Sequence, residues 1–275
     1  MCTVFTKTAI GASHLKDRRP CQDHSACYRD EEKTIVTVCD GHGGATYIRS
    51  HKGSRFASAA LISALQKVDQ TAFRKRKDDL TETLRIRIIT EWNALVAQDL
   101  AAHPIKRCET ERLSDRQKEM LKRDPYKAYG TTAHGACLTG NKLICVSLGD
   151  GGFFFLKNRQ ITPAFEEDDE QAANLTHSLC EEDASRFLHV SVADARTVDG
   201  VLLCSDGVVN PYGNLDNFRR SFVLPALRSL ANAKPNELSE FIVSLGETKG
   251  TGDDVSIAVL FKERVVKKYG KRCAK

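Results

Sequence analysis

The chain has 275 residues, of which 41% are hydrophobic and 28% charged. This is the composition of a soluble globular protein, and it excludes disordered and fibrous classes. No apolar run approaches the roughly 20 residues that a membrane helix needs, and Met1–Lys7 lacks the basic and apolar regions of a secretory signal. We therefore expect a cytoplasmic protein that is not embedded in a membrane.

The net charge of +5 comes from one end of the chain. Residues 262–275 carry seven basic residues and one acidic residue, so the rest of the chain has a net charge of −1. A nucleic-acid-binding domain usually has a basic face across its fold, and this distribution argues against one. The ten cysteines contain no Cys-x-x-Cys pair, which favours reduced cytosolic thiols over a zinc site.

The first half of the chain alternates between strand and helix patterns. Short β-branched runs predict strands at 1–12 and 34–39. Apolar residues three and four positions apart predict helices at 54–68 and 80–100. Residues 103–128 are polar and of mixed charge, which indicates a loop with a short helix around Ser114–Lys122.

The second half begins with strand patterns and ends with one. We expect strands at 131–138, 142–148 and 153–157, a surface loop opened by the acidic run 166–170, and a buried strand at 201–204. Two helices follow near 216–232 and 235–245, and then a strand at 255–261. No linker or repeat divides the chain, so we expect one α/β domain over residues 1–261 and a basic tail over residues 262–275.

Aspartates stand at the ends of several predicted strands. An apolar run leads into Asp40-Gly41, Asp150-Gly151 and Asp206-Gly207, and Asp253 precedes the last strand. Turn chemistry alone explains any one of these sites. Four of them at one sheet edge would repel each other and raise their own pKa values, unless a cation bound there. Oxygen ligands without thiolates favour Mg²⁺ or Mn²⁺.

The order of these motifs resembles that of the metal-dependent protein phosphatases of the 2C type (the PPM family). The resemblance extends from about Ala9 to Phe261. It rests on five motifs in the family's order, which are Asp40-Gly-His-Gly-Gly44, Gly130-Thr-Thr-Ala133, Gly149-Asp150, Ser205-Asp-Gly207 and Gly252-Asp-Asp-Val-Ser256. It implies a four-layer α-β-β-α sandwich, in which two mainly antiparallel sheets are flanked by helix pairs at 54–68 with 80–100 and at 216–232 with 235–245.

The resemblance also implies a set of metal ligands. Asp40 would bridge two Mn²⁺ or Mg²⁺ ions, with the Gly41 carbonyl, Asp206 and Asp253 completing the ligand set. Asp150 would help to hold a third ion together with Asp206. Asp254 occupies the place of the family's asparagine, so we treat it as a neighbour of the metal site rather than a ligand.

Four further residues receive roles from the resemblance. Arg18 matches the family's phosphate-binding arginine by spacing, although the adjacent Arg19 competes for that role. Asp23 matches a carboxylate that holds metal-bound water, and His42 is the candidate proton donor to the leaving alkoxide. Two departures from the family stand near them: Gln22 replaces an acidic residue, and Gly151-Gly152 replaces Ser-Arg.

These assignments predict a monomeric serine/threonine protein phosphatase. It would hydrolyse phosphoserine and phosphothreonine in proteins by direct attack of a hydroxide that bridges two metal ions. Two alternatives stay open: a non-catalytic module that binds phosphoproteins, and a nucleic-acid or membrane-surface protein that uses the tail and the run Arg74–Lys77. Residues 114–127 could instead dock a protein partner.

Overall fold

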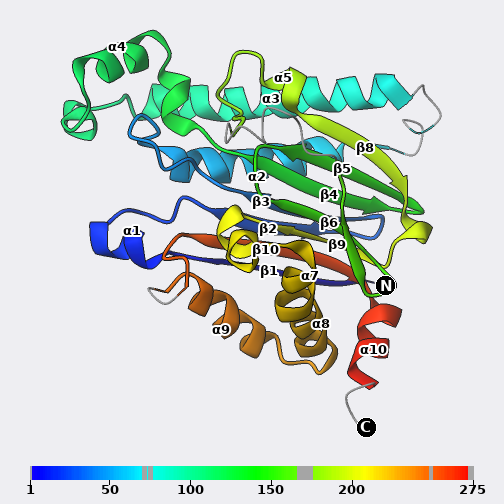
Figure 1. The fold of residues 1–275 in the computed structure, drawn as a ribbon. Coiled ribbons are helices and arrows are strands. Elements are labelled where there is room, and N and C mark those ends of the chain that lie inside the picture. Colours follow the sequence, from blue (N-terminus) through cyan, green and yellow to red (C-terminus); the bar gives the residue numbers. More distant parts are fainter. Residues whose placement is uncertain (1, 70–72, 74–76, 166–175, 248–249, 272–275) are drawn as a thin grey trace.

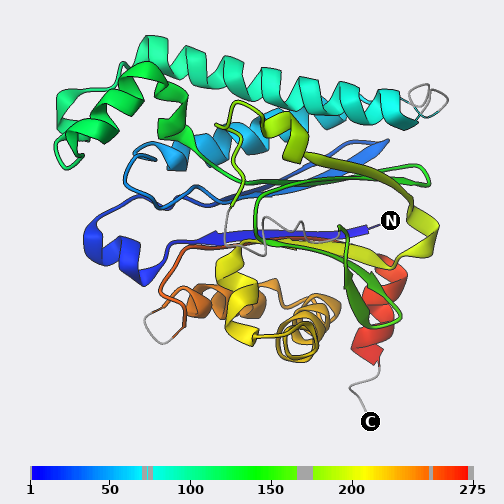
Figure 2. The same cartoon turned by 45° about the horizontal axis from the view of Figure 1, so that its top comes forward.

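The chain folds into four layers, with two β-sheets packed face to face between two layers of helices (Figures 1 and 2). The computed structural model describes residues 2–69, 73, 77–165, 176–247 and 250–271. Neighbouring strands pair antiparallel throughout both sheets. The predicted fold class is therefore confirmed.

Each sheet has five strands in the described residues. The first sheet has the order β1 (Cys2–Ala9), β10 (Val255–Lys262), β9 (Gly200–Cys204), β6 (Gly152–Lys157), β7 (Gln160–Pro163). The second has the order β2 (His24–Arg29), β3 (Lys33–Cys39), β4 (Ala133–Thr139), β5 (Lys142–Leu148), β8 (His189–Asp194).

Helices cover the outer face of each sheet. The β2–β8 sheet is covered by α2 (Ser50–Gln66) and the long α3 (Lys77–Ala102). The β1–β7 sheet is covered by α7 (Leu215–Phe218), α8 (Leu224–Ala231) and α9 (Pro235–Leu245). The basic tail begins as α10 (Glu263–Lys271), which packs beside α8. None of the helices in the described ranges is long and apolar enough to cross a bilayer.

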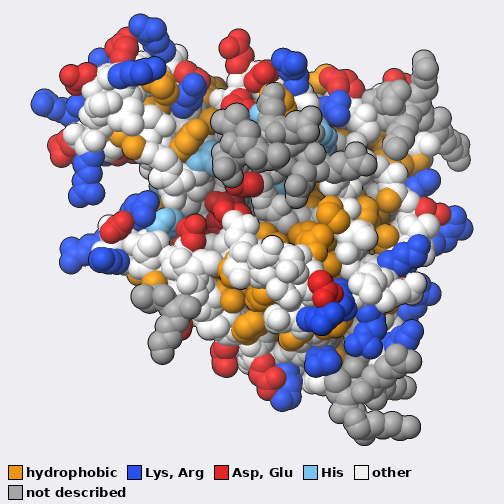
Figure 3. Space-filling view, in the orientation of Figure 1, with side chains coloured by type: hydrophobic (Ala, Val, Ile, Leu, Met, Phe, Trp, Pro, Cys, Tyr) orange, Lys and Arg blue, Asp and Glu red, His pale blue; other side chains and the backbone are white. Residues whose placement is uncertain are grey.

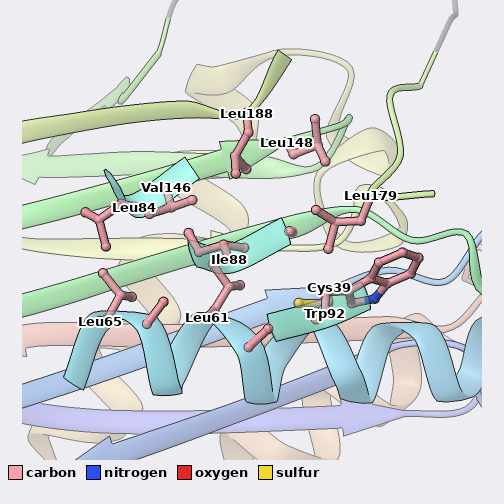
Figure 4. Packing of buried hydrophobic residues seen from close by; sticks show 14 of the residues in the cluster. Cys39, Leu61, Leu65, Leu84, Ile88, Trp92, Val146, Leu148, Leu179 and Leu188 are labelled. Atoms are coloured by element: carbon pink, nitrogen blue, oxygen red, sulfur yellow. The ribbon is translucent and has the colours of Figure 1, made fainter. Parts of the chain in front are cut away.

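Three apolar layers hold these four layers of secondary structure together. Leu61 and Leu65 of α2 and Leu84, Ile88 and Trp92 of α3 are buried against the β2–β8 sheet (Figure 4). A second cluster lies between the two sheets, and a third lies between the β1–β7 sheet and its helices. Burial of one large apolar side chain contributes about 1.5–3 kcal/mol. The facing apolar stripes of the helices therefore set their positions on the sheets.

A lobe between α3 and β4 projects beyond the sandwich (Figure 1). We call residues 103–129 the α4 lobe. It contains α4 (Asp115–Arg123) between two 3-10 turns, Arg107–Thr110 and Pro125–Tyr129. Ser114 and Gln117 form a reciprocal capping box that starts α4. The predicted short helix at 114–122 is thus present.

Some predicted boundaries were wrong. The strand expected at 1–12 ends at Ala9, and the chain then enters the short helix α1 (Ala12–Asp17). The helix expected at 216–232 contains a π-helical turn at Arg219–Val223. Pro225 lacks an N–H group, and the wider turn just before it accommodates the lost backbone hydrogen bond. Strands β2, β7 and β8 were not predicted. The sequences of β2 and β8 are of mixed polarity, and β7 has only four residues.

Three predicted features cannot be compared with the structure. The acidic run 166–170, residues 74–76 of the basic run and the last four residues of the tail lie outside the described residues. The nine cysteines inside the described ranges are all free thiols.

Candidate active site

The aspartates at the strand ends converge from both sheets. Asp40 follows β3, Asp150 follows β5, Asp206 starts α6 (Asp206–Val209) directly after β9, and Asp253 precedes β10. All four line one cavity of about 170 Å³, together with Gly41, His42, Gly43, His14, Gln22 and Asp254. Figure 3 shows acidic side chains gathered in a recess on this side of the molecule. The predicted convergence is therefore present, although two sheets share it rather than one.

The backbone around Asp40 is held by hydrogen bonds to the start of β4. The Asp40 N–H donates to Thr132 Oγ1 at 2.9 Å, and the Thr132 N–H and the Thr131 hydroxyl both donate to the Asp40 carbonyl at 2.8 Å. Gly41 packs so closely that a Cβ there would lie 2.7 Å from the Gln22 carbonyl oxygen. Only glycine fits at this position, which explains the Asp-Gly pair.

The turn that carries Asp150 also requires glycine. Gly151 has a φ of +81°, and a Cβ on it would lie 2.9 Å from both the Cys204 carbonyl oxygen and His134 Nε2. The Thr176 hydroxyl donates to Asp150 Oδ2 at 2.6 Å. The family's serine at position 151 is thus absent for a steric reason in this chain.

Asp23 lies close to the Asp40 carboxylate but is not among the residues that line the cavity. Its side chain is 4% exposed, and neither oxygen has a hydrogen-bond partner of normal geometry among the described residues. Burial is the main cause that raises the pKa of Asp23 to about 7, although Asp40 and Ser205 lie close enough to oppose the shift. A buried carboxyl without a partner is costly, so the two oxygens of Asp23 are free to accept hydrogen bonds from a bound group.

The neighbouring aspartates, Asp40 and Asp206, are crowded by other carboxylates as well. Removal from water raises the pKa of Asp40 well above its usual range, and the negative charges of Asp23 and Asp206 add to the shift. Burial and the charges of Asp150 and Asp253 raise the pKa of Asp206 in the same way. Bound divalent cations would reverse these shifts, because they replace repulsion with attraction.

The donor set fits a hard cation that keeps part of its water shell. No group of three His, Cys, Asp or Glu side chains in the described part of the chain is arranged to enclose an ion alone. Mg²⁺ and similar ions are commonly held by one or two carboxylates, with water completing an octahedron. The aspartates and the Gly41 backbone that line the cavity offer oxygen donors of the kind that such an ion accepts.

His42 begins the glycine-rich loop beside this cavity. Its ring centroid lies 4.9 Å from that of Tyr47, and its Nε2 is buried without a hydrogen-bond partner among the described residues. Burial lowers the pKa of His42, while the Asp150 charge opposes that shift. The ring is therefore neutral near pH 7 until a further negative charge approaches it.

The two arginines lie outside the cavity. Neither Arg18 nor Arg19 is among the residues that line it. Arg18 is exposed and ends α1 in the left-handed conformation, with a φ of 54°. Arg19 is half-buried, donates from Nη2 to Asp17 at 3.2 Å, and has a buried Nε without a described partner. The structure thus separates the two side chains without placing either one at the cavity.

Sequence reasoning placed Asp254 beside the proposed metal site, but it missed His14, which pairs with Asp254 there. Asp254 is 3% exposed and accepts hydrogen bonds from the Gly11 N–H, the Gln22 N–H and His14 Nδ1, at 2.7, 2.6 and 2.8 Å. The Gln22 side chain donates to the His42 carbonyl and to Ser50 Oγ. His14 lies in a short polar helix, and no sequence pattern there indicates a functional residue.

Solved structures share this architecture at low sequence identity. The catalytic domain of the serine/threonine phosphatase PstP, solved with two manganese ions, is 20% identical, with 94% of this chain and 97% of that chain covered and a TM-score of 0.56. Stp1 from Staphylococcus aureus is 16% identical, with 96% of each chain covered and a TM-score of 0.62. The Mycobacterium tuberculosis phosphatase PstP/Ppp is 19% identical over 95% of this chain and 99% of that chain, with a TM-score of 0.56. At these identities the likeness shows the fold alone.

Two antiparallel sheets between layers of helices, with a cluster of carboxylates at one rim, define the class of fold and candidate site. The sequence profile described as "Protein phosphatase 2C" matches residues 10–242. The chain therefore belongs to the protein phosphatase 2C family, and it is a serine/threonine protein phosphatase by class. No curated protein sequence gives a significant match.

Proposed function

We propose that this chain hydrolyses phosphoserine and phosphothreonine monoesters in proteins with the help of two Mn²⁺ or Mg²⁺ ions. The observation that carries the proposal is the meeting of four strand-end aspartates from two sheets in one small cavity. Asp40 would contact both ions, with the Gly41 carbonyl, Asp206 and Asp253 as the other protein ligands. Asp150 would contribute to a third ion with Asp206.

When bound, a pair of such ions lowers the pKa of a water molecule toward about 7 and screens the charge of the phosphate, so that hydroxide can attack phosphorus directly. The chain's own residues would orient the attacking water and protonate the leaving group. Asp23 would accept a hydrogen bond from a water in the site, which its two unpartnered oxygens favour. His42 would donate a proton to the leaving alkoxide, because a phosphate dianion nearby raises the pKa of its imidazole.

One of the two arginines, Arg18 or Arg19, would recognise the phosphate from the end of α1. A planar guanidinium suits two phosphate oxygens better than an ammonium group does. Separate Arg18→Ala and Arg19→Ala variants assign the role, since the residue that contacts substrate should raise the KM for a phosphopeptide and the other should not. If neither variant changed the KM, neither arginine would contact the substrate.

The decisive experiment measures p-nitrophenyl phosphate hydrolysis with and without Mn²⁺. We expect activity only with the metal, and a loss of at least about 10³-fold in Asp40→Asn and Asp253→Asn, which is about 4 kcal/mol of barrier. The fold of both variants should persist, because each change also relieves carboxylate repulsion. A wild-type protein without metal-dependent turnover would favour the non-catalytic binding module.

The proposed site of action is the cytoplasm, where free thiols persist. Nine cysteines of the described part of the chain are unpaired, and five of them are buried. Proteins of oxidising compartments seldom keep so many free cysteines.

A further inference from the structure

A second cavity lies in the α4 lobe, away from the carboxylates. It has a volume of about 630 Å³ and lies between the end of α3, the turn at 104–111 and α4. Its apolar part is formed by Leu100, Ile105 and Leu121 with two prolines, Pro104 and Pro125. Leu121 is 4% exposed, so the floor of this cavity is continuous with the apolar core. We call this cavity the lobe groove.

The rim of the lobe groove is basic. Lys106, Arg107, Lys118 and Lys122 line it, against one acidic residue, Glu111. Lys106 and Arg107 form no ion pair within the described part of the chain, and the Nζ atoms of Lys118 and Lys122 lie 3.7 and 3.8 Å from their helix partners. The whole lobe carries eight basic and five acidic residues, whereas the chain outside the lobe and the tail is acidic overall.

Buried hydrogen bonds hold the walls of the lobe groove in place. Arg49 is 4% exposed and donates from Nη1 to the His103 carbonyl at 2.7 Å and from Nε to Glu109 Oε1 at 2.7 Å. Glu109 Oε2 accepts from the Lys106 N–H at 2.8 Å. The turn that carries the basic rim is thus preorganised, which lowers the entropic cost of binding a partner.

The lobe groove is linked to the candidate active site through the loop that bears His42. The Arg49 N–H donates to the Ala128 carbonyl at 2.7 Å, and the His42 N–H donates to the Gly130 carbonyl at 3.1 Å. The last residues of the α4 lobe are therefore next to the loop that carries His42. In Figure 3 the lobe is at the upper left, above and to one side of the central acidic side chains.

We propose that the lobe groove binds a segment of the phosphoprotein substrate that carries an apolar side chain flanked by acidic residues, while the phosphorylated residue occupies the carboxylate site. This inference rests on the proposed function and adds the substrate class to it. The basic rim complements acidic side chains, and the aliphatic floor accepts an apolar one. The lining contains no aromatic ring on which a nucleic-acid base would stack, so a peptide fits better than RNA or DNA.

The test compares two phosphothreonine peptides. One carries an Asp-Glu-Leu-Glu-Asp segment several residues from the phosphothreonine, on either side, and the other carries Ser-Gly-Leu-Gly-Ser in its place. The variant reverses two rim charges, Arg107→Glu with Lys122→Glu. Its matched control reverses two exposed charges elsewhere, Lys157→Glu with Arg228→Glu.

The wild type should have a lower KM for the acidic peptide than for the neutral one. The rim variant should raise the KM for the acidic peptide about tenfold, which corresponds to about 1.4 kcal/mol, and should leave p-nitrophenyl phosphate hydrolysis unchanged. The control variant should behave as wild type. The preference should shrink in 0.5 M NaCl, because salt screens exposed charges.

Binding of the same acidic peptide without phosphate, followed by fluorescence anisotropy, separates this inference from the proposed function. Binding that the rim variant weakens and the control does not would support the lobe groove even in a protein without turnover. Equal KM values for the two peptides in the wild type, or equal effects of the two variants, would overturn it. So would a protein that binds a single-stranded oligonucleotide through the rim residues and does not bind the acidic peptide.

Discussion

At the scale of single residues, Asp254 shows how a carboxylate next to a proposed metal ligand can serve the fold instead. Its two oxygens accept hydrogen bonds from two backbone N–H groups and from His14. These contacts join the segments around Gly11 and Gln22 to the last strand, which brings both ends of the chain to the base of the cavity. The partners already in place leave Asp254 little capacity to coordinate an ion as well.

We expect Asp254→Ala to lower the free energy of unfolding by about 2 kcal/mol, since it leaves three buried donors unpaired, while relief of repulsion with Asp23 offsets part of the loss. Asp254→Asn keeps an acceptor and should cost less. Urea denaturation measures both, and Asp17→Ala at the exposed end of α1 should stay within about 0.5 kcal/mol of wild type. An Asp254→Ala protein as stable as wild type would contradict this assignment.

The raised pKa of Asp23 predicts how the stability of the metal-free protein depends on pH. Its pKa is raised from 3.8 to about 7 in the folded state, so the folded protein binds more protons than the unfolded chain between those values. Stability from this group is therefore present at low pH and is lost as the pH rises toward 7.

In the presence of a chelator, the wild type should lose more stability between pH 5 and pH 8 than Asp23→Asn does. Urea midpoints at the two pH values, measured for both proteins, give this difference directly. Identical pH dependence in the two proteins would mean that Asp23 is not a buried carboxyl of raised pKa.

At the scale of elements, one arginine secures the α4 lobe to the sandwich. Arg49 donates to the His103 and Pro104 carbonyls, to Glu109 and to the Tyr129 hydroxyl. The hydrogen bonds with Glu109 raise the pKa of Arg49, and the same pairing lowers the pKa of Glu109. The network acts together with the lobe side chains that pack into the main core, among them Leu113 and Leu121.

We expect Arg49→Ala to cost about 3 kcal/mol of stability, because it leaves the buried carbonyls and the carboxylate without a donor. Arg49→Lys should recover little of the loss, since an ammonium group cannot reach the same set of acceptors. Limited proteolysis with trypsin should show faster cleavage at Arg107 in Arg49→Ala than in the exposed control Arg228→Ala. Unchanged cleavage at Arg107 would show that the lobe is held by other contacts.

At the scale of the whole molecule, the carboxylate site lies where the two sheets meet, and it takes aspartates from both of them. Asp40 and Asp150 come from the β2–β8 sheet, whereas Asp206 and Asp253 come from the β1–β7 sheet. Without a cation these groups repel each other across the interface. A bound cation would therefore stabilise the packing of the sheets as well as the reaction.

We expect Mn²⁺ at ~100 times its Kd to add about 2.7 kcal/mol to the stability of the wild type, which is a rise in Tm of roughly 5–10 °C for a chain of this size. Asp40→Asn should lose this increment, and its metal-free Tm should equal or exceed that of the wild type. Differential scanning calorimetry in EDTA and in Mn²⁺ measures both effects. A Tm of the wild type that does not respond to Mn²⁺ or Mg²⁺ would count against the metal site.

Much of this architecture could be predicted from local pattern. Apolar periodicity indicated α2 and α3, and short apolar runs indicated β3, β5 and β9, because burial of one or both faces leaves a regular pattern in the sequence. Pro235 and Gly246 marked the two ends of α9. Strands β2 and β8 left a weaker trace, since both are edge strands of mixed polarity. The π-helical turn before Pro225 depends on the packing of Phe218 and Phe222, which no periodicity records.

The sequence by itself determined the aspartates, their glycines and the family, because a strand that ends in Asp-Gly needs only local chemistry to be recognised. Tertiary structure alone decided that these strand ends come from two different sheets, that His14 pairs with Asp254 at the cavity, and that the α4 lobe carries a basic groove. Those relations join residues up to 243 positions apart, as in the Gly11–Asp254 hydrogen bond. Such pairs meet only when the whole core forms, and local propensity carries no information about them.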